Sequence, residues 1–173
     1  AARKAAEVAR IRRIMANRSN HERTFFRGLH FYTAYGTQIL QGRSIKMYHW
    51  NTKTALHSHW NRYNTGSRQQ EVTGFWQRDN NDWFQLQTLN GQQIVNGSTV
   101  RFRHNLTNNY IYISEGHRSP TTRQDEASCR RYNGSDQRFH FRVEIMSSWA
   151  GDNHLRVGDA VRFVNLGNNR TLH

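Results

Sequence analysis

The amino-acid sequence predicts an all-β protein, a β-trefoil preceded by a basic N-terminal helix. From about Tyr35 the chain consists of short β-branched and aromatic runs separated by Asn, Gly, Ser and Thr, with one proline in 173 residues. This texture is typical of an all-β fold. A set of strands also recurs three times, which is the number of units in a trefoil. We therefore expect a helical leader over residues 1–34 and a trefoil over residues 35–173.

The leader begins with a segment rich in strong helix formers. Val8, Ile11 and Met15 recur at spacings of three and four residues between charged side chains, which predicts a basic amphipathic helix over residues 1–16. The Asn-rich stretch 17–20 ends this helix. Ser19 and Glu22 then form a capping-box pattern, which predicts a second short helix that runs into residues 25 and 26.

Three segments of the remaining chain share an apolar-basic-apolar pattern. They are Ile45-Lys46-Met47, Val100-Arg101-Phe102 and Val161-Arg162-Phe163. Each is followed by a polar turn and a second strand, beginning at Leu56, Ile111 and Leu172. Within each pair of units the two strands have the same offset, which is 55 residues from the first unit to the second (45 to 100, 56 to 111) and 61 from the second to the third (100 to 161, 111 to 172). We expect Met47, Phe102 and Phe163 to face one core.

Two later strands recur in the first two units. Glu71-Val72-Thr73 matches Glu126-Ala127-Ser128, and Trp83 aligns with Phe141. Four strands in each of three units would close a small barrel with a cap of hairpins. The third unit breaks off at His173, so we expect it to be incomplete, with its remaining strands elsewhere or with its edge covered by something else.

The charge of the chain favours an acidic partner. The formal net charge is +13, and 22 of the 25 basic residues are Arg. The planar guanidinium suits phosphate and carboxylate groups, so the excess indicates RNA, an anionic lipid surface or an acidic protein, or else it serves solubility. The leader is denser in charge than the rest, and Arg10, Arg12, Arg13 and Arg18 are its candidate nucleic-acid or anion contacts. A single cysteine, Cys129, excludes an internal disulfide and a cysteine-based metal cluster.

Three motifs of the first unit carry a family resemblance. Leu56-His57-Ser58-His59, then Gly66 to Thr73 with Gln69 and Gln70, then Asn80-Asn81-Asp82-Trp83, resemble the LHSH, GSxQQxVT and NNDW series of MIR repeats. Their order is closest to that of protein O-mannosyltransferases. The resemblance covers roughly residues 35 to 173, and in the second unit Ile111 to Ser114 replaces the LHSH motif.

The resemblance implies a non-catalytic β-trefoil of the endoplasmic reticulum lumen that recognises a glycan, a glycoprotein or an acceptor polypeptide. Mannosyl transfer is done by transmembrane parts of those enzymes, which this sequence does not contain. We therefore expect no catalytic residue and no cofactor, and a place in a larger chain or assembly. The alternative is an RNA-binding or ribonucleoprotein component that has reused the fold and whose arginines contact the nucleic acid.

The candidate ligand-binding residues are His57, Ser58, His59, Gln69 and Gln70. His57 and His59 are two apart on a predicted strand, so their side chains share one face, where they would contact a sugar or an anion or would hold the structure together. A third metal ligand is not evident, so we predict no metal site. Gln69 and Gln70 either contact the ligand or hold a loop in place. The nearby acidic residues Glu71, Asp79 and Asp82 would suit a hydrolase only if two of them were paired, and the tryptophans Trp50, Trp60, Trp76 and Trp83 either stack on a ligand or fill the core.

Overall fold

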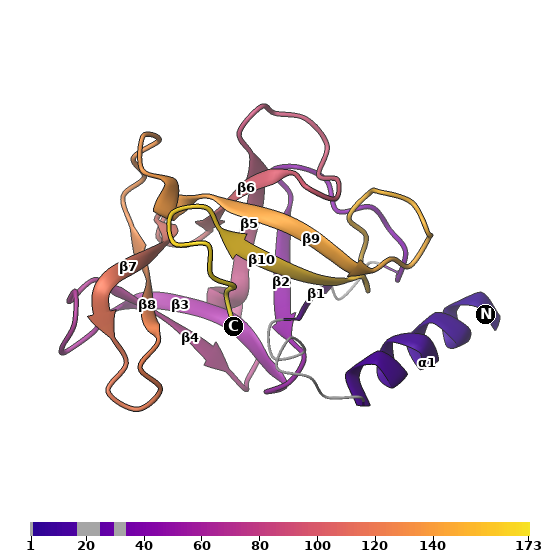
Figure 1. Ribbon diagram of the computed structural model, residues 1–173, viewed down its shortest axis with the longest axis horizontal. Helices are drawn as coiled ribbons and strands as arrows, with labels where there is room; N and C mark the ends of the chain where they lie inside the picture. The colour runs from indigo at the N-terminus through magenta and orange to yellow at the C-terminus, as the bar shows by residue number, and fades with distance from the viewer. Residues whose placement is uncertain (1, 17–24, 30–33) are drawn as a thin grey trace.

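The all-β prediction is confirmed by the computed structural model, which describes residues 2–16, 25–29 and 34–173, without the side chains of residues 10–16 and 29 (Figure 1). The N-terminal helix is α1 (Ala2–Ala16). The strands are β1 (Phe26–Leu29), β2 (Ser44–His49), β3 (Thr54–Arg62), β4 (Gln70–Phe75), β5 (Trp83–Thr88), β6 (Thr99–His104), β7 (Tyr110–Arg118), β8 (Asp125–Arg130), β9 (Phe141–Ser147) and β10 (Ala160–Asn165). Two 3-10 turns, η2 (Asn80–Asp82) and η3 (Gln137–Phe139), precede β5 and β9.

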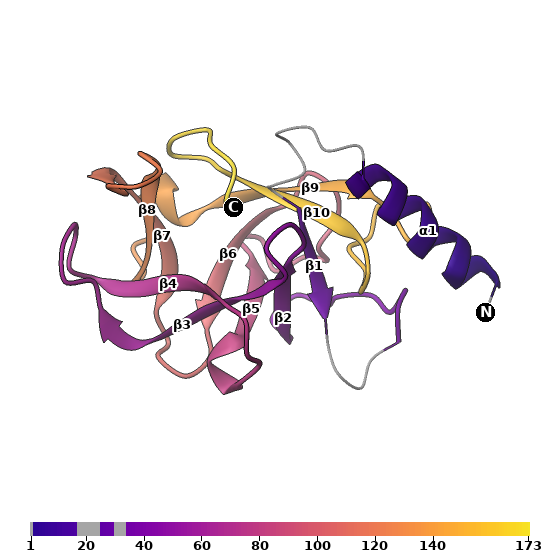
Figure 2. The ribbon, with the colours of Figure 1, turned by 90° about the horizontal axis from the view of Figure 1, so that it is seen from below.

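Strands from all three units close a barrel. They follow one another in the order β1-β10-β9-β6-β5-β2, and a further pairing of β1 with β2 returns the sheet to its start (Figures 1 and 2). The first strand of each unit pairs with a fourth strand: β2 with β5, β6 with β9, and β10 with β1. Closure of this kind removes the free edges of the barrel strands.

Two hairpins, β3–β4 and β7–β8, form the cap and meet each other. Strand β4 pairs with β8 where Gln70 lies opposite Cys129. In the third unit, Thr171 forms a bridge with Val164. This bridge corresponds to the start of β3 and β7, where those strands first pair with β2 and β6. A cavity of about 460 Å³ lies at this place, between Ile113 of β7 and the residues around Leu172.

Strand β1 corrects the expectation of a second helix. Phe26 begins a strand rather than ending a helix, while residues 17–24 lie outside the described part of the chain. Phe26 pairs with Val161 and with His49, so it joins the last unit to the first. The sheet therefore begins on the N-terminal side of the boundary expected at residue 34, because β1 supplies the fourth strand of the third unit.

The pairing register also corrects one expected match between the units. Phe84 pairs with Ile45, and Phe141 pairs with Val100. Phe84 is therefore the counterpart of Phe141, and the expected match of Trp83 with Phe141 was displaced by one residue. Because side chains alternate along a strand, this displacement moves Trp83 out of the core layer.

The core lies on the axis of the barrel. The expectation that Met47, Phe102 and Phe163 face one core is confirmed, since all three are fully buried in a single cluster. The rings of Phe102 and Phe163 meet edge to face with centroids 4.8 Å apart. Such contacts between buried rings add to the free energy gained from burial itself.

Gly28 is required where β1 crosses this core. A Cβ at this position would lie 2.5 Å from Cδ1 of Ile45 and 2.6 Å from Cδ1 of Ile39. The corresponding positions in β5 and β9 hold Leu86 and Val143, which are fully buried. Ile45 and Ile39 therefore occupy, beside Gly28, the space that a strand side chain fills in the other two units.

Helix α1 packs beside the turn that follows β9 (Figures 1 and 2). Arg3 donates from Nη2 to the carbonyl of Ala150 at 3.1 Å. The hydroxyl of Ser147 lies 3.1 Å from Oε1 of Glu7. Within the described residues, no helix combines the length and the apolar character needed to cross a bilayer.

Candidate functional site

The two faces of the β3–β4 hairpin have different environments. Ser58 is fully buried, and Leu56 belongs to the core. His57 and His59 point to the other face, because side chains alternate along a strand, and their rings lie 5.3 Å apart. The prediction that the two histidines share a face is therefore confirmed.

The turn η2 holds two carboxylates over His57. Asp79 caps this turn: its side chain accepts from the N–H of Asn81 at 2.8 Å, and its own N–H donates to Asp82 Oδ2 at 3.0 Å. This reciprocal capping box fixes the direction of the Asp82 carboxylate. His57 Nδ1–H donates to Asp82 Oδ1 at 2.8 Å, and both residues are buried.

Lys46 completes the network around Asp82. Its ammonium donates to the carbonyl of Asp79 at 2.7 Å and lies 3.4 Å from Asp82 Oδ2. Ligand atoms of His57, Asp79 and Asp82 lie within 4.8 Å of one another, a spacing that would suit a metal ion. Lys46 already supplies a positive charge to the Asp82 carboxylate, so His57 and Asp82 are part of a buried ion-pair network.

The outer part of the hairpin face is open to solvent. His59 Nε2 lies 3.0 Å from Glu71 Oε1, and both side chains are about one quarter exposed. On the other side of His57, the ring of Phe75 lies 4.4 Å away, and Trp76 lies 6.4 Å beyond Phe75. Trp76 is 73% exposed. His57, His59, Glu71, Phe75, Trp76 and Asp79 together are called the first-repeat face below.

Ser58 and Gln70, two of the candidate ligand-binding residues, are tied into the interior. Ser58 Oγ donates to the carbonyl of Glu71 at 2.7 Å and accepts from Gln70 Nε2 at 2.8 Å. The amide of Gln70 also bonds to Thr107 at 3.0 Å and to Asn109 at 2.8 Å. These contacts join the first unit to the second, and they place both residues away from the first-repeat face.

The remaining candidate residues are Gln69 and the four arginines of the leader. Gln69 is half-buried, and its backbone N–H donates to Ser67 Oγ at 3.2 Å. Arg10, Arg12 and Arg13 belong to α1, but their side chains, like the whole of Arg18, lie outside the described residues. Sequence reasoning did not place Phe75 in the site. The sequence signal that could have identified Phe75 is its place as the apolar residue at the end of β4, two residues after the GSxQQxVT motif.

Two of the four tryptophans named from the sequence lie on the surface. Trp60 and Trp76 are 71% and 73% exposed. Trp83 is half-buried, with the Lys46 ammonium 4.9 Å from its ring, and Trp50 packs against the buried Phe25. Single exposed aromatic side chains are ordinary on protein surfaces, so Trp76 is of interest because of the ring of Phe75 beside it.

Fold and geometry together define a three-unit β-trefoil with a polar and aromatic face on its first cap hairpin. No protein-family model matches the chain. A stromal cell-derived factor 2-like protein of Arabidopsis thaliana is 33% identical over 133 residues, 70% of this chain and 61% of that protein. The dolichyl-phosphate-mannose–protein mannosyltransferase 1 of Candida albicans is 29% identical over 123 residues, 64% of this chain and 14% of the enzyme. The chain thus spans less than two thirds of these relatives.

Solved structures agree with these sequence relationships. The SDF2-like protein from Arabidopsis thaliana has a TM-score of 0.71 and 30% identity over 79% of this chain and 78% of the other. The S. cerevisiae protein O-mannosyltransferase Pmt1–Pmt2 complex bound to the sugar donor has a TM-score of 0.70 and 26% identity, over 80% of this chain and 21% of the matched one. The chain belongs to the MIR-domain family, which includes the SDF2-like proteins and the MIR region of protein O-mannosyltransferases.

Proposed function

We propose that this chain is a non-catalytic MIR β-trefoil module that recognises a glycan or a glycosylated polypeptide through the first-repeat face. The observation that carries the proposal is the exposed ring of Trp76, which is connected to His59 by successive ring contacts through Phe75 and His57. A sugar ring has an apolar face and a rim of hydroxyl groups. An exposed indole suits the apolar face, and nearby imidazole and carboxylate groups suit the hydroxyls.

The acidic groups of the face support recognition rather than hydrolysis. Asp82 accepts hydrogen bonds from His57 and from the N–H of Asp79, and it is paired with Lys46. A general acid must carry a proton that it can transfer, and a general base must reach a water molecule. A fully buried carboxylate with three donors meets neither requirement. Glu71 and Asp79 remain available to accept hydrogen bonds from hydroxyl groups.

The relatives support a setting for the module. The matched part of the S. cerevisiae complex makes up 21% of a mannosyltransferase chain, which favours a role as one part of a larger chain or assembly. The same relatives favour the endoplasmic reticulum lumen as the compartment and a mannose-containing glycan or an acceptor polypeptide as the ligand.

An RNA-binding role is the alternative, and the net charge of +13 favours it. Several arginines of the described trefoil are already paired with carboxylates. They are Arg118, Arg138, Arg142, Arg156, Arg162 and Arg170. These pairs reduce the positive charge that the trefoil offers to phosphates, so the leader would have to supply much of the attraction.

A titration with matched tryptophan variants tests the proposal. Binding of a panel of mannose-containing oligosaccharides to the protein is measured by calorimetry, with Trp76→Ala and Trp60→Ala as variants of almost equal exposure. We expect Trp76→Ala to weaken binding about tenfold, an effect of about 1.4 kcal/mol, and Trp60→Ala to leave it unchanged. Equal effects of both variants, or binding of single-stranded RNA but of no oligosaccharide, would contradict a glycan site on the first-repeat face.

A further inference from the structure

The second unit has its own version of the first-repeat face. Ala55 pairs with Phe75 in the first hairpin, and Tyr110 pairs with Arg130 in the second. Each partner in the second pair lies 55 residues after its counterpart (55 to 110, 75 to 130). Arg130 therefore occupies the position that Phe75 occupies in the first unit.

The neighbouring positions change in character as well. Tyr112 replaces His57, and Arg131 replaces the exposed Trp76. The stacking geometry persists, since the guanidinium of Arg130 lies 4.1 Å from the centroid of the Tyr112 ring. The second unit therefore keeps the layout of the face but substitutes positive charge for aromatic surface. Tyr112, Ser114, Ser128, Arg130 and Arg131 are called the second-repeat site below.

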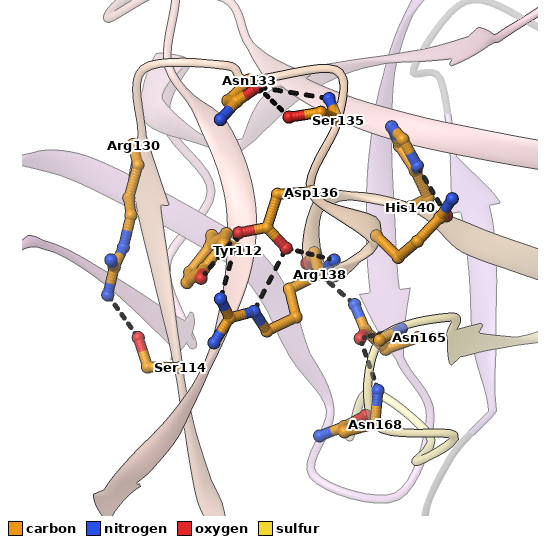
Figure 3. A network of polar contacts seen from close by, with 12 residues as sticks. Tyr112, Ser114, Arg130, Asn133, Ser135, Asp136, Arg138, His140, Asn165 and Asn168 are labelled. Atoms are coloured by element: carbon orange, nitrogen blue, oxygen red, sulfur yellow. Dashed lines mark hydrogen bonds and ion pairs between the residues drawn. The ribbon is translucent and has the colours of Figure 1, made fainter.

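Serine hydroxyls hold the Arg130 side chain in place. Nε–H donates to Ser128 Oγ at 3.1 Å. Nη2–H donates to Ser114 Oγ (Figure 3). Burial lowers the pKa of Arg130, but a guanidinium stays charged at neutral pH. Its orientation is thus fixed by neutral groups and by the Tyr112 ring. A guanidinium fixed in advance loses less entropy when it binds a ligand.

The nearby carboxylates are engaged with other groups. Asp136 accepts from Arg138 Nε at 3.1 Å and from the Tyr112 hydroxyl at 3.0 Å (Figure 3). Glu126 accepts from the backbone N–H of Ser67 at 3.1 Å. Of the five N–H groups of Arg130, two have the serine acceptors above, and the other three have no acceptor among the described residues.

We propose that the second-repeat site binds an oxyanion carried on a sugar ring, either the carboxylate of a uronic acid or a phosphate ester. Both present paired oxygens to a planar guanidinium, which is the geometry that arginine binds best. The site is separate from the first-repeat face, which offers aromatic rings and carboxylates to a neutral sugar. Two repeats of one fold would then bind two different chemical features of a glycan, a neutral sugar ring and an oxyanion.

Titrations with three small sugars test the proposal. Glucuronic acid, glucose 6-phosphate and neutral glucose are titrated into the protein and followed by ligand-induced NMR shifts. We expect one or both anionic sugars to bind more tightly than glucose. The carboxylate and phosphate arms distinguish the two sources of charge. Equal binding of all three sugars, or binding of none, would overturn the proposal.

Variants of Arg130 assign the binding to this residue. Arg130→Gln should weaken binding of the anionic sugar about tenfold or more, because a hydrogen-bonded charge is lost. Arg130→Phe, which installs the first-unit residue, should do the same while the thermal transition stays cooperative. The exposed Arg43 provides the control, and Arg43→Gln, with the same loss of charge, should bind as the parent does. Unchanged affinity in both Arg130 variants would remove the residue from the site.

Two further measurements separate this site from other interpretations. Anion binding should persist in Trp76→Ala, so failure of the first-repeat proposal does not imply failure of this one. A single-stranded RNA oligonucleotide is also titrated with and without Arg130→Gln. If RNA binds through Arg130 and the anionic sugars do not bind, the site is a phosphate contact of a nucleic-acid surface and the sugar proposal is wrong.

Discussion

Phe26 faces His49 across β1 and β2, with ring centroids 5.1 Å apart and planes inclined by 55°. Phe84 and His104 have the same relationship across β5 and β6, at 5.0 Å and 54°. The strand that comes first in the chain therefore reproduces in detail the packing of an internal barrel strand. It contributes to the barrel as a fourth strand and not as an appendage.

Truncation of Phe26 should destabilise the protein as much as truncation of a central core residue. Phe26→Ala and Phe84→Ala are each expected to lower the free energy of unfolding by about 3–5 kcal/mol, since both rings are buried at equivalent positions. Urea denaturation measures the effect. Leu106→Ala, which changes an exposed side chain, should stay within about 0.5 kcal/mol. A loss of less than about 1 kcal/mol in Phe26→Ala would show that β1 is dispensable for closure.

The two histidines of the first-repeat face should separate into a structural and a surface residue. His57→Ala removes the partner of a buried carboxylate and should cost about 1–3 kcal/mol of stability. His59→Ala breaks only a partly exposed pair with Glu71 and should cost no more than about 0.5 kcal/mol. Chemical denaturation of both variants decides the matter, and the reverse order of effects would contradict the geometry described for η2.

Stability should fall as the pH rises through the mildly acidic range because of Asp159. Burial raises the pKa of Asp159 to about 6, although its carboxylate accepts from the N–H groups of Trp149 and Arg156. An unfolded Asp titrates near about 3.9, so between these values the folded state holds the extra proton. The contribution of Asp159 to the free energy of unfolding should therefore decrease from about pH 4 to about pH 6, by at most about 3 kcal/mol.

Thermal melts of Asp159→Asn and Asp152→Asn across this range provide the check for that pH dependence. In Asp159→Asn the fall between about pH 4 and pH 6 should disappear, because the titrating group is gone. Asp152 has the opposite behaviour, since hydrogen bonds from Arg156 lower the pKa of its carboxyl. Its replacement should leave the fall in place. An unaltered pH profile in Asp159→Asn would assign the effect to another group.

The thiol of Cys129 should be unreactive in the folded protein. Burial raises the pKa of Cys129 to about 12, and the thiolate is the form that reacts. A disulfide reagent at neutral pH should label the native protein more slowly than the urea-unfolded protein by about a hundredfold or more. Rapid labelling under native conditions would indicate that β4 and β8 separate readily, since Cys129 lies opposite Gln70 at their junction.

If the protein binds RNA, the leader should dominate the salt dependence. Replacing Arg10, Arg12, Arg13 and Arg18 with Ala removes four positive charges. Each phosphate contact contributes a slope of about 0.7 to 0.9 to the dependence of log affinity on log salt, so four contacts should flatten it by about three units. Binding of single-stranded RNA at several salt concentrations measures this slope. The same slope in the quadruple variant would exclude the leader as the contact surface.

The barrel could be predicted from the sequence because its first strands repeat a clear alternation. Ile45, Val100 and Val161 each begin an alternation of fully buried apolar residues, which continues at Met47, Phe102 and Phe163. The offset between two units is the same for the first and the second strand, which marks the strands as repeats. Strand β1 has no such signal. It is four residues long, and Gly28 interrupts the alternation because the side chains of Ile45 and Ile39 fill the space. A phenylalanine recurs at equivalent positions as Phe26, Phe84 and Phe141, and this recurrence was the sequence signal that could have identified β1.

The site was predictable as a region but not residue by residue. The motifs identified the hairpin, and the strand period placed His57 and His59 on one face. The alternation of side chains along a strand does not predict how a neighbouring turn such as η2 folds over that strand. The capping box of η2 aims Asp82 at His57, while the Gln70 amide turns inward to Thr107. Both outcomes depend on contacts between units rather than on the local sequence.

The closure of the barrel by β1 also bears on how the chain folds during synthesis. β1 pairs with β2, its near neighbour in sequence, and with β10, close to the other end of the described chain. A nascent chain can therefore form the β1–β2 contact early, but one side of β1 stays without its partner until β10 leaves the ribosome. During that interval the unpaired edge of β1 is exposed. Such edges can pair with other chains and aggregate, or can be bound by chaperones.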